Sequence, residues 1–209
     1  MLEDVSWQTY ERLVNEVNNR NVRLTYDRGR LEIMSPSREH ERYAHLLGRI
    51  VAILTEELDI NMSGGGSMTF KRADVEKGLE PDDCYWIANE PLVREKMELD
   101  LTIVPPPDLA IEVDITRSHL NRHSVYAALG VPEIWCFDGQ TILSYRLGES
   151  GECTVGSVSL TFPYLALEEV ARFLLSDMAE GETRWAKRFR AWVSHEVAPK
   201  ASGGENGGR

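Results

Sequence analysis

The chain has 209 residues and a formal net charge of −11, because 34 Asp and Glu residues outnumber 23 Lys and Arg residues. A chain of this length can bury enough apolar surface to fold without disulfides or a structural metal, and we expect one domain over residues 1–197 with a disordered tail over 198–209. The acidic balance argues against a protein that binds nucleic acid through a broad basic surface.

The first part of the chain is predicted to form a β-hairpin between two amphipathic helices. In both helices apolar residues recur at steps of three and four, and each helix begins at a serine that can cap it. The hairpin is indicated by two short apolar runs on either side of a turn that contains a glycine. These elements are helix 6–17, strands 22–26 and 30–34, and helix 38–58, with Ser6, Gly29 and Ser37 at the caps and the turn.

The middle of the chain contains a run that is typical of a buried central strand. It covers residues 108–114, follows three prolines and alternates between two faces. One face is apolar, whereas the other carries the carboxylates of Glu112 and Asp114. The expected elements before it are strands near 67–71 and 84–87 and an irregular, charged stretch over 89–104.

The last part is predicted to contain a helix, three strands and two further helices. Gly130 is a suitable residue to end the first of these helices, and Asp138-Gly139 marks a hairpin turn. The elements are helix 117–129, strands 133–137, 141–147 and 152–160, and helices 167–175 and 183–197. Strands and helices in this order argue for a single α/β fold with a mixed sheet.

Two carboxylates stand out as candidate metal ligands. Asp82 lies at the entrance to a strand, and Glu112 lies inside the apolar central strand, where an unpaired carboxylate is costly to bury. Mg²⁺ takes oxygen ligands, commonly one or two carboxylates, and the carbonyl of Val113 would add another. Such a site would polarise a phosphate and generate hydroxide for in-line attack. The structural alternative is that Asp82 caps a turn and Glu112 pairs with Arg122 or Lys71.

Around these acids the chain resembles a known family. The matching segments, in chain order, are residues 29–37 with His40, Glu80-Pro81-Asp82, residues 107–113 and residues 126–135. Together they resemble the Uma-two family of restriction endonucleases, within the PD-(D/E)XK nucleases, and Asp82 and Glu112 are the acids that carry over. The resemblance implies a restriction-endonuclease-like αβββαβ core with extra hairpin strands and C-terminal helices. It also implies cleavage of DNA that depends on Mg²⁺, with Mn²⁺ able to substitute, and a homodimer.

One position departs from the family pattern. The residue two after the second acid is a lysine in the pattern, but Asp114 stands there in this chain. In the family the lysine looks migrated onto the following helix, at the position of Arg122. Arginine can stabilise a phosphoryl transition state, although it keeps its proton. Arg122 is therefore a candidate catalytic cation, with a salt bridge to Glu112 or Asp114 as the alternative.

His40 and the C-terminal helix carry two further hypotheses. His40 is in phase with Tyr43 and Leu47, so it faces inward. There it would contact the phosphate or a water on the metal, or make only a structural hydrogen bond. Residues 184–192 combine an aromatic stripe with basic side chains. We expect the stripe to pack on the core or on a partner subunit, and the basic face is a candidate for contact with the DNA backbone.

The leading hypothesis is a metal-dependent DNA endonuclease whose site consists of Asp82, Glu112, the carbonyl of Val113, Arg122 and His40. Two alternatives stay open: a nuclease-derived DNA-binding or scaffold protein that no longer cuts, which Asp114 favours, and a hydrolase of a smaller phosphodiester.

The distribution of charge sharpens the hypothesis. Part of the negative charge is concentrated in six carboxylates that would suit a cation, namely Glu80, Asp82, Asp83, Asp108, Glu112 and Asp114. The remaining charge predicts DNA binding that is weak, metal-dependent and sensitive to salt. The chain shows neither a signal-peptide pattern nor an apolar run of membrane-spanning length, so we expect a cytoplasmic protein.

Overall fold

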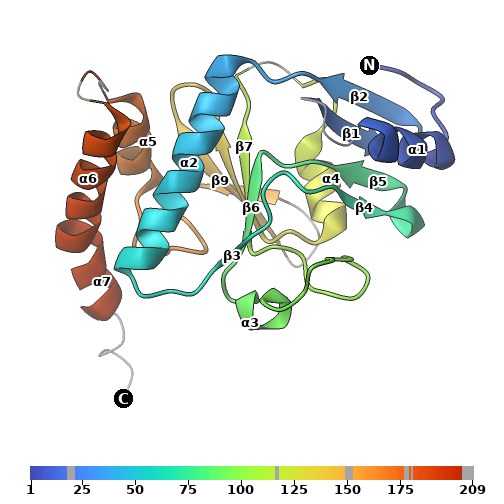
Figure 1. Cartoon of the computed structure of the whole chain (residues 1–209). Helices are drawn as coiled ribbons and strands as arrows, with labels where there is room; N and C mark the ends of the chain where they lie inside the picture. Colours follow the sequence, from blue (N-terminus) through green and yellow to red (C-terminus); the bar gives the residue numbers. More distant parts are fainter. Residues whose placement is uncertain (18–21, 116–117, 149–152, 177–178, 180, 204–209) are drawn as a thin grey trace.

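The computed structural model describes residues 1–17, 22–115, 118–148, 153–176, 179 and 181–203 (Figure 1). The helices are α1 (Trp7–Val17), α2 (Arg38–Glu57), α3 (Glu90–Val93), α4 (Arg122–Leu129), α5 (Leu167–Leu175), α6 (Glu182–Trp192) and α7 (Ala198–Gly203). A π-helical turn, Val193–Val197, joins α6 to α7. One sheet contains β1 (Arg23–Asp27), β2 (Arg30–Met34), β4 (Phe70–Arg72) and β5 (Lys77–Leu79). The other contains β3 (Ser63–Gly64), β6 (Asp83–Trp86), β7 (Leu109–Val113), β8 (Glu133–Phe137), β9 (Ile142–Leu147) and β10 (Cys153–Gly156).

The two sheets and their helices form a mixed α/β fold, as the sequence predicts. The smaller sheet has the order β2-β1-β5-β4, and the larger has the order β10-β9-β8-β7-β6-β3. In the larger sheet β7 and β8 run parallel, joined through α4, whereas the other neighbouring pairs are antiparallel. Figure 1 shows α1 beside the smaller sheet, and α2 between the larger sheet and the C-terminal helices.

Strand β7 is buried on both faces, which explains its apolar sequence. Leu109, Ile111 and Val113 belong to the core cluster that contains the apolar side chains of α2, and the predicted alternation is confirmed. Ala110 joins a second cluster with Val125 and other apolar side chains of α4. Any carboxylate on this strand therefore lies between two packed layers.

Several elements differ from the sequence prediction. Helix α4 begins at Arg122 rather than near residue 117, because the Asn121 side chain caps it by accepting a hydrogen bond from the Ser124 N–H at 3.1 Å. Strand β5 lies between the strands expected near 67–71 and 84–87, where the sequence analysis predicts no strand. Gly78 disfavours a strand prediction, because glycine is rare inside strands. The structure requires a glycine there, since a Cβ would come within 2.3 Å of the Tyr10 hydroxyl. The strand expected over residues 152–160 is limited to β10, and residue 152 lies outside the described part.

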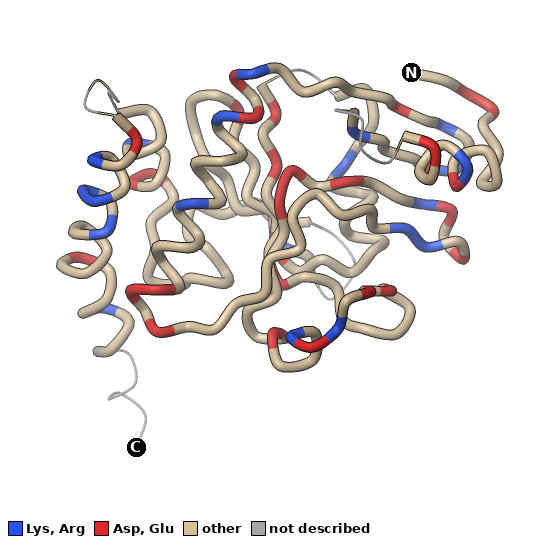
Figure 2. The backbone as a smooth tube through the Cα atoms, viewed as in Figure 1, with Lys and Arg blue, Asp and Glu red and all other residues tan. Residues whose placement is uncertain are grey.

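The C-terminal helices pack on the core. Trp185 and Phe189 are fully buried in the cluster that also holds α2, so the aromatic stripe has the packing role that the sequence favours. Figure 2 shows Lys and Arg residues along the outer side of α6. The tail expected to be disordered from residue 198 starts with α7, and residues 204–209 are outside the described part. Among the helices that the structure describes, none has the length and apolar character needed to cross a membrane.

Candidate active site

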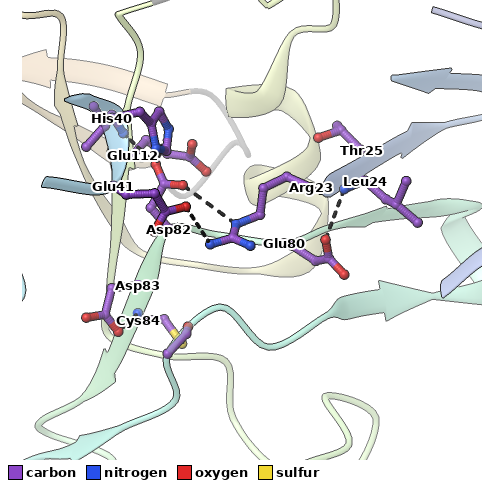
Figure 3. Close-up of polar contacts among 12 residues, drawn as sticks. Arg23, Leu24, Thr25, His40, Glu41, Glu80, Asp82, Asp83, Cys84 and Glu112 are labelled. Carbon is purple, nitrogen blue, oxygen red and sulfur yellow. Dashed lines mark hydrogen bonds and ion pairs between the residues drawn. The ribbon is translucent and has the colours of Figure 1, made fainter. Parts of the chain in front are cut away.

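Asp82 and Glu112 lie together where β6 and β7 run side by side. Asp82 precedes β6, and its backbone N–H donates to the carbonyl of Ile111 at 3.1 Å. Its Oδ2 accepts a hydrogen bond from the Val113 N–H at 2.7 Å, so the backbone on both sides of Glu112 fixes Asp82. The side chains are 2% exposed for Asp82 and 9% for Glu112. The structure thus brings the two predicted acids into one buried site (Figure 3).

Glu112 is anchored through one of its two oxygens. Its Oε1 accepts hydrogen bonds from Arg122 Nη2 at 2.5 Å and from the Tyr126 hydroxyl. Burial raises the pKa of Glu112 to about 7, although Arg122 acts in the opposite direction and Asp82 adds to the increase. Glu112 Oε2 accepts no hydrogen bond from the residues that the structure describes.

Arg122 is held from three sides. Its Nη1 donates to Thr25 Oγ1 at 2.5 Å, and its Nη2 donates to the carbonyl of Glu80 at 2.8 Å as well as to Glu112. The salt bridge to Glu112 that the sequence offers as the structural alternative is therefore present. The pairing with Lys71 is not, because that ammonium pairs with Glu11 at 3.0 Å.

His40 stands at the start of α2 and faces Asp82. The Ser37 side chain accepts a hydrogen bond from the His40 N–H at 3.1 Å, which fixes the first turn of the helix as predicted. His40 Nε2 lies 3.2 Å from Asp82 Oδ2, without the alignment of a hydrogen bond. Burial lowers the pKa of His40, but the carboxylates of Asp82 and its neighbours outweigh burial and raise it. Nδ1 is buried and has no partner among the described residues.

Arg23 and Glu41 also belong to this site, although no pattern in the sequence indicates either. Arg23 Nη2 lies 3.6 Å from Glu41 Oε1, and Arg23 Nε lies 3.9 Å from Asp82 Oδ1. Figure 3 shows the Arg23 guanidinium between the Glu41 and Asp82 carboxylates and Glu80. The sequence cannot predict their role, because β1 and α2 approach the start of β6 only in the folded chain.

Three acids of the predicted concentration do not join the Asp82 and Glu112 carboxylates, because each has other hydrogen-bond partners. Glu80 accepts hydrogen bonds from the Leu24 N–H and the Thr69 hydroxyl. Asp108 accepts from the backbone N–H of Ile87 and from Asn89.

Asp83 pairs with the Tyr85 hydroxyl on the other side of β6. A Cβ on Gly48 of α2 would lie 2.9 Å from Asp83 Oδ2, so this pair occupies the space under the helix. Consecutive residues of an extended chain point to opposite faces, which separates Asp83 from Asp82.

A small cavity opens beside Glu112. Its volume is about 140 Å³, and its lining includes Glu32, Glu112, Val113, Asp114 and Arg122. Asp114 is exposed at this cavity, and no lysine lines the cavity within the described part of the chain. Glu32 is engaged by the Ser118 hydroxyl and the His119 N–H, which tie β2 to the segment before α4. No group of three or more His, Cys, Asp or Glu side chains that could hold a metal ion is found among the described residues.

Comparisons with known proteins bear on this geometry. The chain matches the model of the Uma2 family, whose description is "Putative restriction endonuclease", over residues 7–173. No curated protein matches the chain. A solved structure titled as a "putative nuclease belonging to DUF820", from Anabaena variabilis ATCC 29413, is similar at 18% sequence identity with a TM-score of 0.51. The likeness covers 73% of this chain and 91% of that chain, and it shows a shared fold. The family match includes every site residue described above, whereas α6 and α7 lie beyond it.

Proposed function

The chain belongs to the Uma2 family, and from this premise we propose that it is a nuclease that hydrolyses DNA phosphodiester bonds with a divalent metal ion. The family and the shared fold support a nuclease in general. The choice of DNA, the metal and the residues that act are parts of the proposal.

One observation connects the proposal to particular residues. Two buried carboxylates are each anchored through one oxygen, and the second oxygen of each, Asp82 Oδ1 and Glu112 Oε2, accepts no hydrogen bond from any described residue. Neither oxygen is among the fully buried atoms that lack a partner, so each stays accessible to a further group although its side chain is largely buried. The pair therefore supports a site that a further group completes.

The donor set suits a hard cation. Mg²⁺ prefers oxygen ligands and is commonly held by one or two carboxylates, with Mn²⁺ accepting similar groups. We propose Asp82, Glu112 and the backbone carbonyl of Val113 as the ligands. A cation bound there would supply Lewis-acid activation of the phosphate and of water.

The remaining residues prepare the site. The Val113 N–H fixes the orientation of Asp82, and Arg122 with Tyr126 fixes that of Glu112. His40 borders Asp82 with an unpaired ring nitrogen, so it can donate a hydrogen bond to a phosphate oxygen or hold a proton. This arrangement supports the predicted assignment of Asp82, Glu112, Arg122 and His40 to the site.

Cleavage of supercoiled plasmid DNA tests the proposal. We expect cleavage with Mg²⁺ or Mn²⁺, none with EDTA, and loss of cleavage in Asp82→Asn and Glu112→Gln. Glu168→Gln is the matched control, because this exposed carboxylate on α5 pairs only with the surface residue Arg172 among the described residues. Cleavage by Glu112→Gln at the rate of the unmodified protein would contradict the site.

A second candidate function has one observation in its favour. Asp114 places a carboxylate at the cavity, at the position where the PD-(D/E)XK pattern has a lysine. A chain that binds DNA with Ca²⁺ or Mg²⁺ and cleaves in no metal would be a DNA-binding protein derived from a nuclease. Hydrolysis of bis(p-nitrophenyl) phosphate without cleavage of DNA would instead identify a hydrolase of smaller phosphodiesters.

We further propose that the protein acts on cytoplasmic DNA as a homodimer. Its net charge of −11 opposes the approach of DNA, so binding should be weak without a divalent cation and should weaken further with salt. Light scattering coupled to size exclusion measures the oligomeric state, and a monomer at assay concentrations would contradict the dimer.

A further inference from the structure

Two arginines flank the carboxylate pair and are buried to the same degree, but they are held very differently. Arg23 is 15% exposed beside Asp82, and Arg122 is 14% exposed beside Glu112. Both terminal nitrogens of Arg122 donate hydrogen bonds, to Thr25, Glu80 and Glu112. The guanidinium of Arg23 donates no hydrogen bond to any described residue, and its closest carboxylate oxygens are 3.6 and 3.9 Å away. Burial therefore does not explain the difference.

The unsatisfied state of Arg23 is unfavourable without a further partner. A guanidinium has five N–H donors, and a buried donor without an acceptor loses its hydration without compensation. Arg23 Nε is fully buried and has no partner within the described chain. Arg122 Nε is also unpaired, but its two terminal nitrogens anchor that side chain.

The atoms around Arg23 are unsatisfied as well. Glu41 Oε1 and both ring nitrogens of His40 are buried without hydrogen-bond partners among the described residues, and His40 is only 2% exposed. All of them gather around Asp82 at the junction of β1, α2 and the entrance to β6 (Figure 3). Unpaired buried groups from β1 and α2, gathered around the Asp82 carboxylate, indicate a position that a polar ligand fills.

We propose that Arg23 is the residue that contacts the scissile phosphate, and that Arg122 is a positioning residue that holds Glu112. This inference rests on the proposed nuclease function and changes the role that the family pattern suggests for Arg122. A planar guanidinium matches two phosphate oxygens, and Arg23 can turn toward them without breaking a hydrogen bond. Arg122 would have to give up three.

The surrounding charges make the contact conditional. The carboxylates of Asp82 and Glu41 repel a phosphate, so Arg23 is expected to reach it only when a divalent cation neutralises Asp82. Removing Arg23 should therefore weaken DNA binding in Ca²⁺ and leave the weak binding in EDTA unchanged. If Arg23 acted only through its positive charge in the general field of the protein, its removal would weaken DNA binding in both Ca²⁺ and EDTA.

Fluorescence anisotropy with a labelled DNA duplex, at several salt concentrations, tests the proposal. In Ca²⁺ we expect Arg23→Gln to lower affinity about tenfold or more, as for loss of a charge-assisted hydrogen bond, and to reduce the salt slope by about 0.9. Arg122→Gln should lower the thermal midpoint and keep the salt slope. Arg172→Gln, on the surface of α5, is the matched control for a lost positive charge. Equal affinity and slope for Arg23→Gln and the unmodified protein would overturn the assignment.

Arg23→Lys keeps the inference testable if Arg23→Gln does not fold. Lysine keeps the positive charge but lacks the two parallel N–H donors of the guanidinium. The salt dependence of DNA binding should therefore stay the same while the affinity falls. An Arg23→Lys protein that binds as tightly as the unmodified protein overturns the direct contact.

The outcomes separate this inference from the nuclease proposal. DNA binding that depends on Arg23, without cleavage in Mg²⁺ or Mn²⁺, supports the contact and contradicts the nuclease. Cleavage and binding that do not change in Arg23→Gln support the nuclease and contradict the contact. A protein that neither binds nor cleaves DNA contradicts both.

Discussion

Two buried glutamates on the neighbouring parallel strands β7 and β8 have opposite surroundings. Glu133, at the start of β8, is fully buried, and five neutral donors reach its two oxygens. Glu112, near the end of β7, is bonded through one oxygen to Arg122 and Tyr126 and keeps the other open. Both are carboxylates within apolar strands, so burial alone does not mark a functional site. The incomplete hydrogen bonding around Glu112 does.

The donors around Glu133 explain its role. They come from Trp135 and Ser144 on the sheet and from Ser159, Leu160 and Thr161 in the segment before α5, at 2.6–3.1 Å. The carboxylate therefore attaches this segment to β8 and β9. Glu112 instead belongs to a cluster in which His40, Glu41 and Arg23 keep buried atoms unpaired. A closed network stabilises the fold, whereas an open one is prepared for a ligand.

The largest expected effect is the loss of activity when Glu112 becomes neutral. Glu112→Gln keeps an oxygen that can accept from Arg122 and Tyr126, but it removes a proposed metal ligand. We expect plasmid cleavage to fall roughly 10³-fold, the size of several kcal/mol of lost charge stabilisation. Glu133→Gln should cleave at the normal rate per folded molecule. The measurement is the initial cleavage rate, corrected for the folded fraction from circular dichroism. Equal losses of activity in Glu112→Gln and Glu133→Gln would contradict a special role for Glu112.

The second largest effect is a loss of stability, and we expect it for Glu133→Gln. Glu133→Gln has one acceptor oxygen where the carboxylate has two, so an amide NH₂ must face donors such as the Thr161 N–H. We expect the free energy of unfolding to fall by about 2–3 kcal/mol, the cost of leaving buried donors unpaired. Urea denaturation measures it, with Glu168→Gln as the control for charge. An unchanged midpoint would mean that the Glu133 network is not the anchor that its geometry indicates.

The sequence predicts the acid pair because its signal is local. Glu112 interrupts an apolar strand, Asp82 precedes another, and neighbouring strands bring them together. The same reasoning predicts most helices and the first hairpin, since caps such as Ser37 and turns such as Gly29 act within a few residues. The start of α4 is missed because Asn121 competes as a cap with the earlier polar residues.

The rest of the site depends on contacts between distant segments. Arg23 is an ordinary polar residue in the sequence, and only the approach of α2 to β1 places it beside Glu41 and Asp82. The difference between Glu112 and Glu133 is also invisible in the sequence, because Ser159 and Thr161 reach Glu133 from more than twenty residues away. Counting acids along the chain likewise groups Asp83 with Asp82, although they face opposite sides of β6.

A third prediction uses the open oxygens directly. Because a cation that binds only the folded chain stabilises it, Ca²⁺ at about 30 times its dissociation constant should add about 2 kcal/mol to the free energy of unfolding. Asp82→Asn and Glu112→Gln should lose this increase, whereas Glu133→Gln should keep it on its lower baseline. Thermal unfolding with Ca²⁺ and with EDTA gives the measurement. An equal shift in all four proteins would place the cation elsewhere.

The smallest effect concerns the Ser37 cap, which places His40 beside Asp82. Ser37→Ala removes the acceptor for the His40 N–H and should lower the free energy of unfolding by about 1 kcal/mol. Ser6→Ala is matched to it, because Ser6 Oγ accepts from the Thr9 N–H at the start of α1, away from the site. Both should destabilise similarly in urea. Only Ser37→Ala should also lower kcat/KM for DNA cleavage, roughly threefold or more, since a small displacement of a site residue affects the rate. Equal activity in the two variants would limit His40 to a structural role beside Asp82.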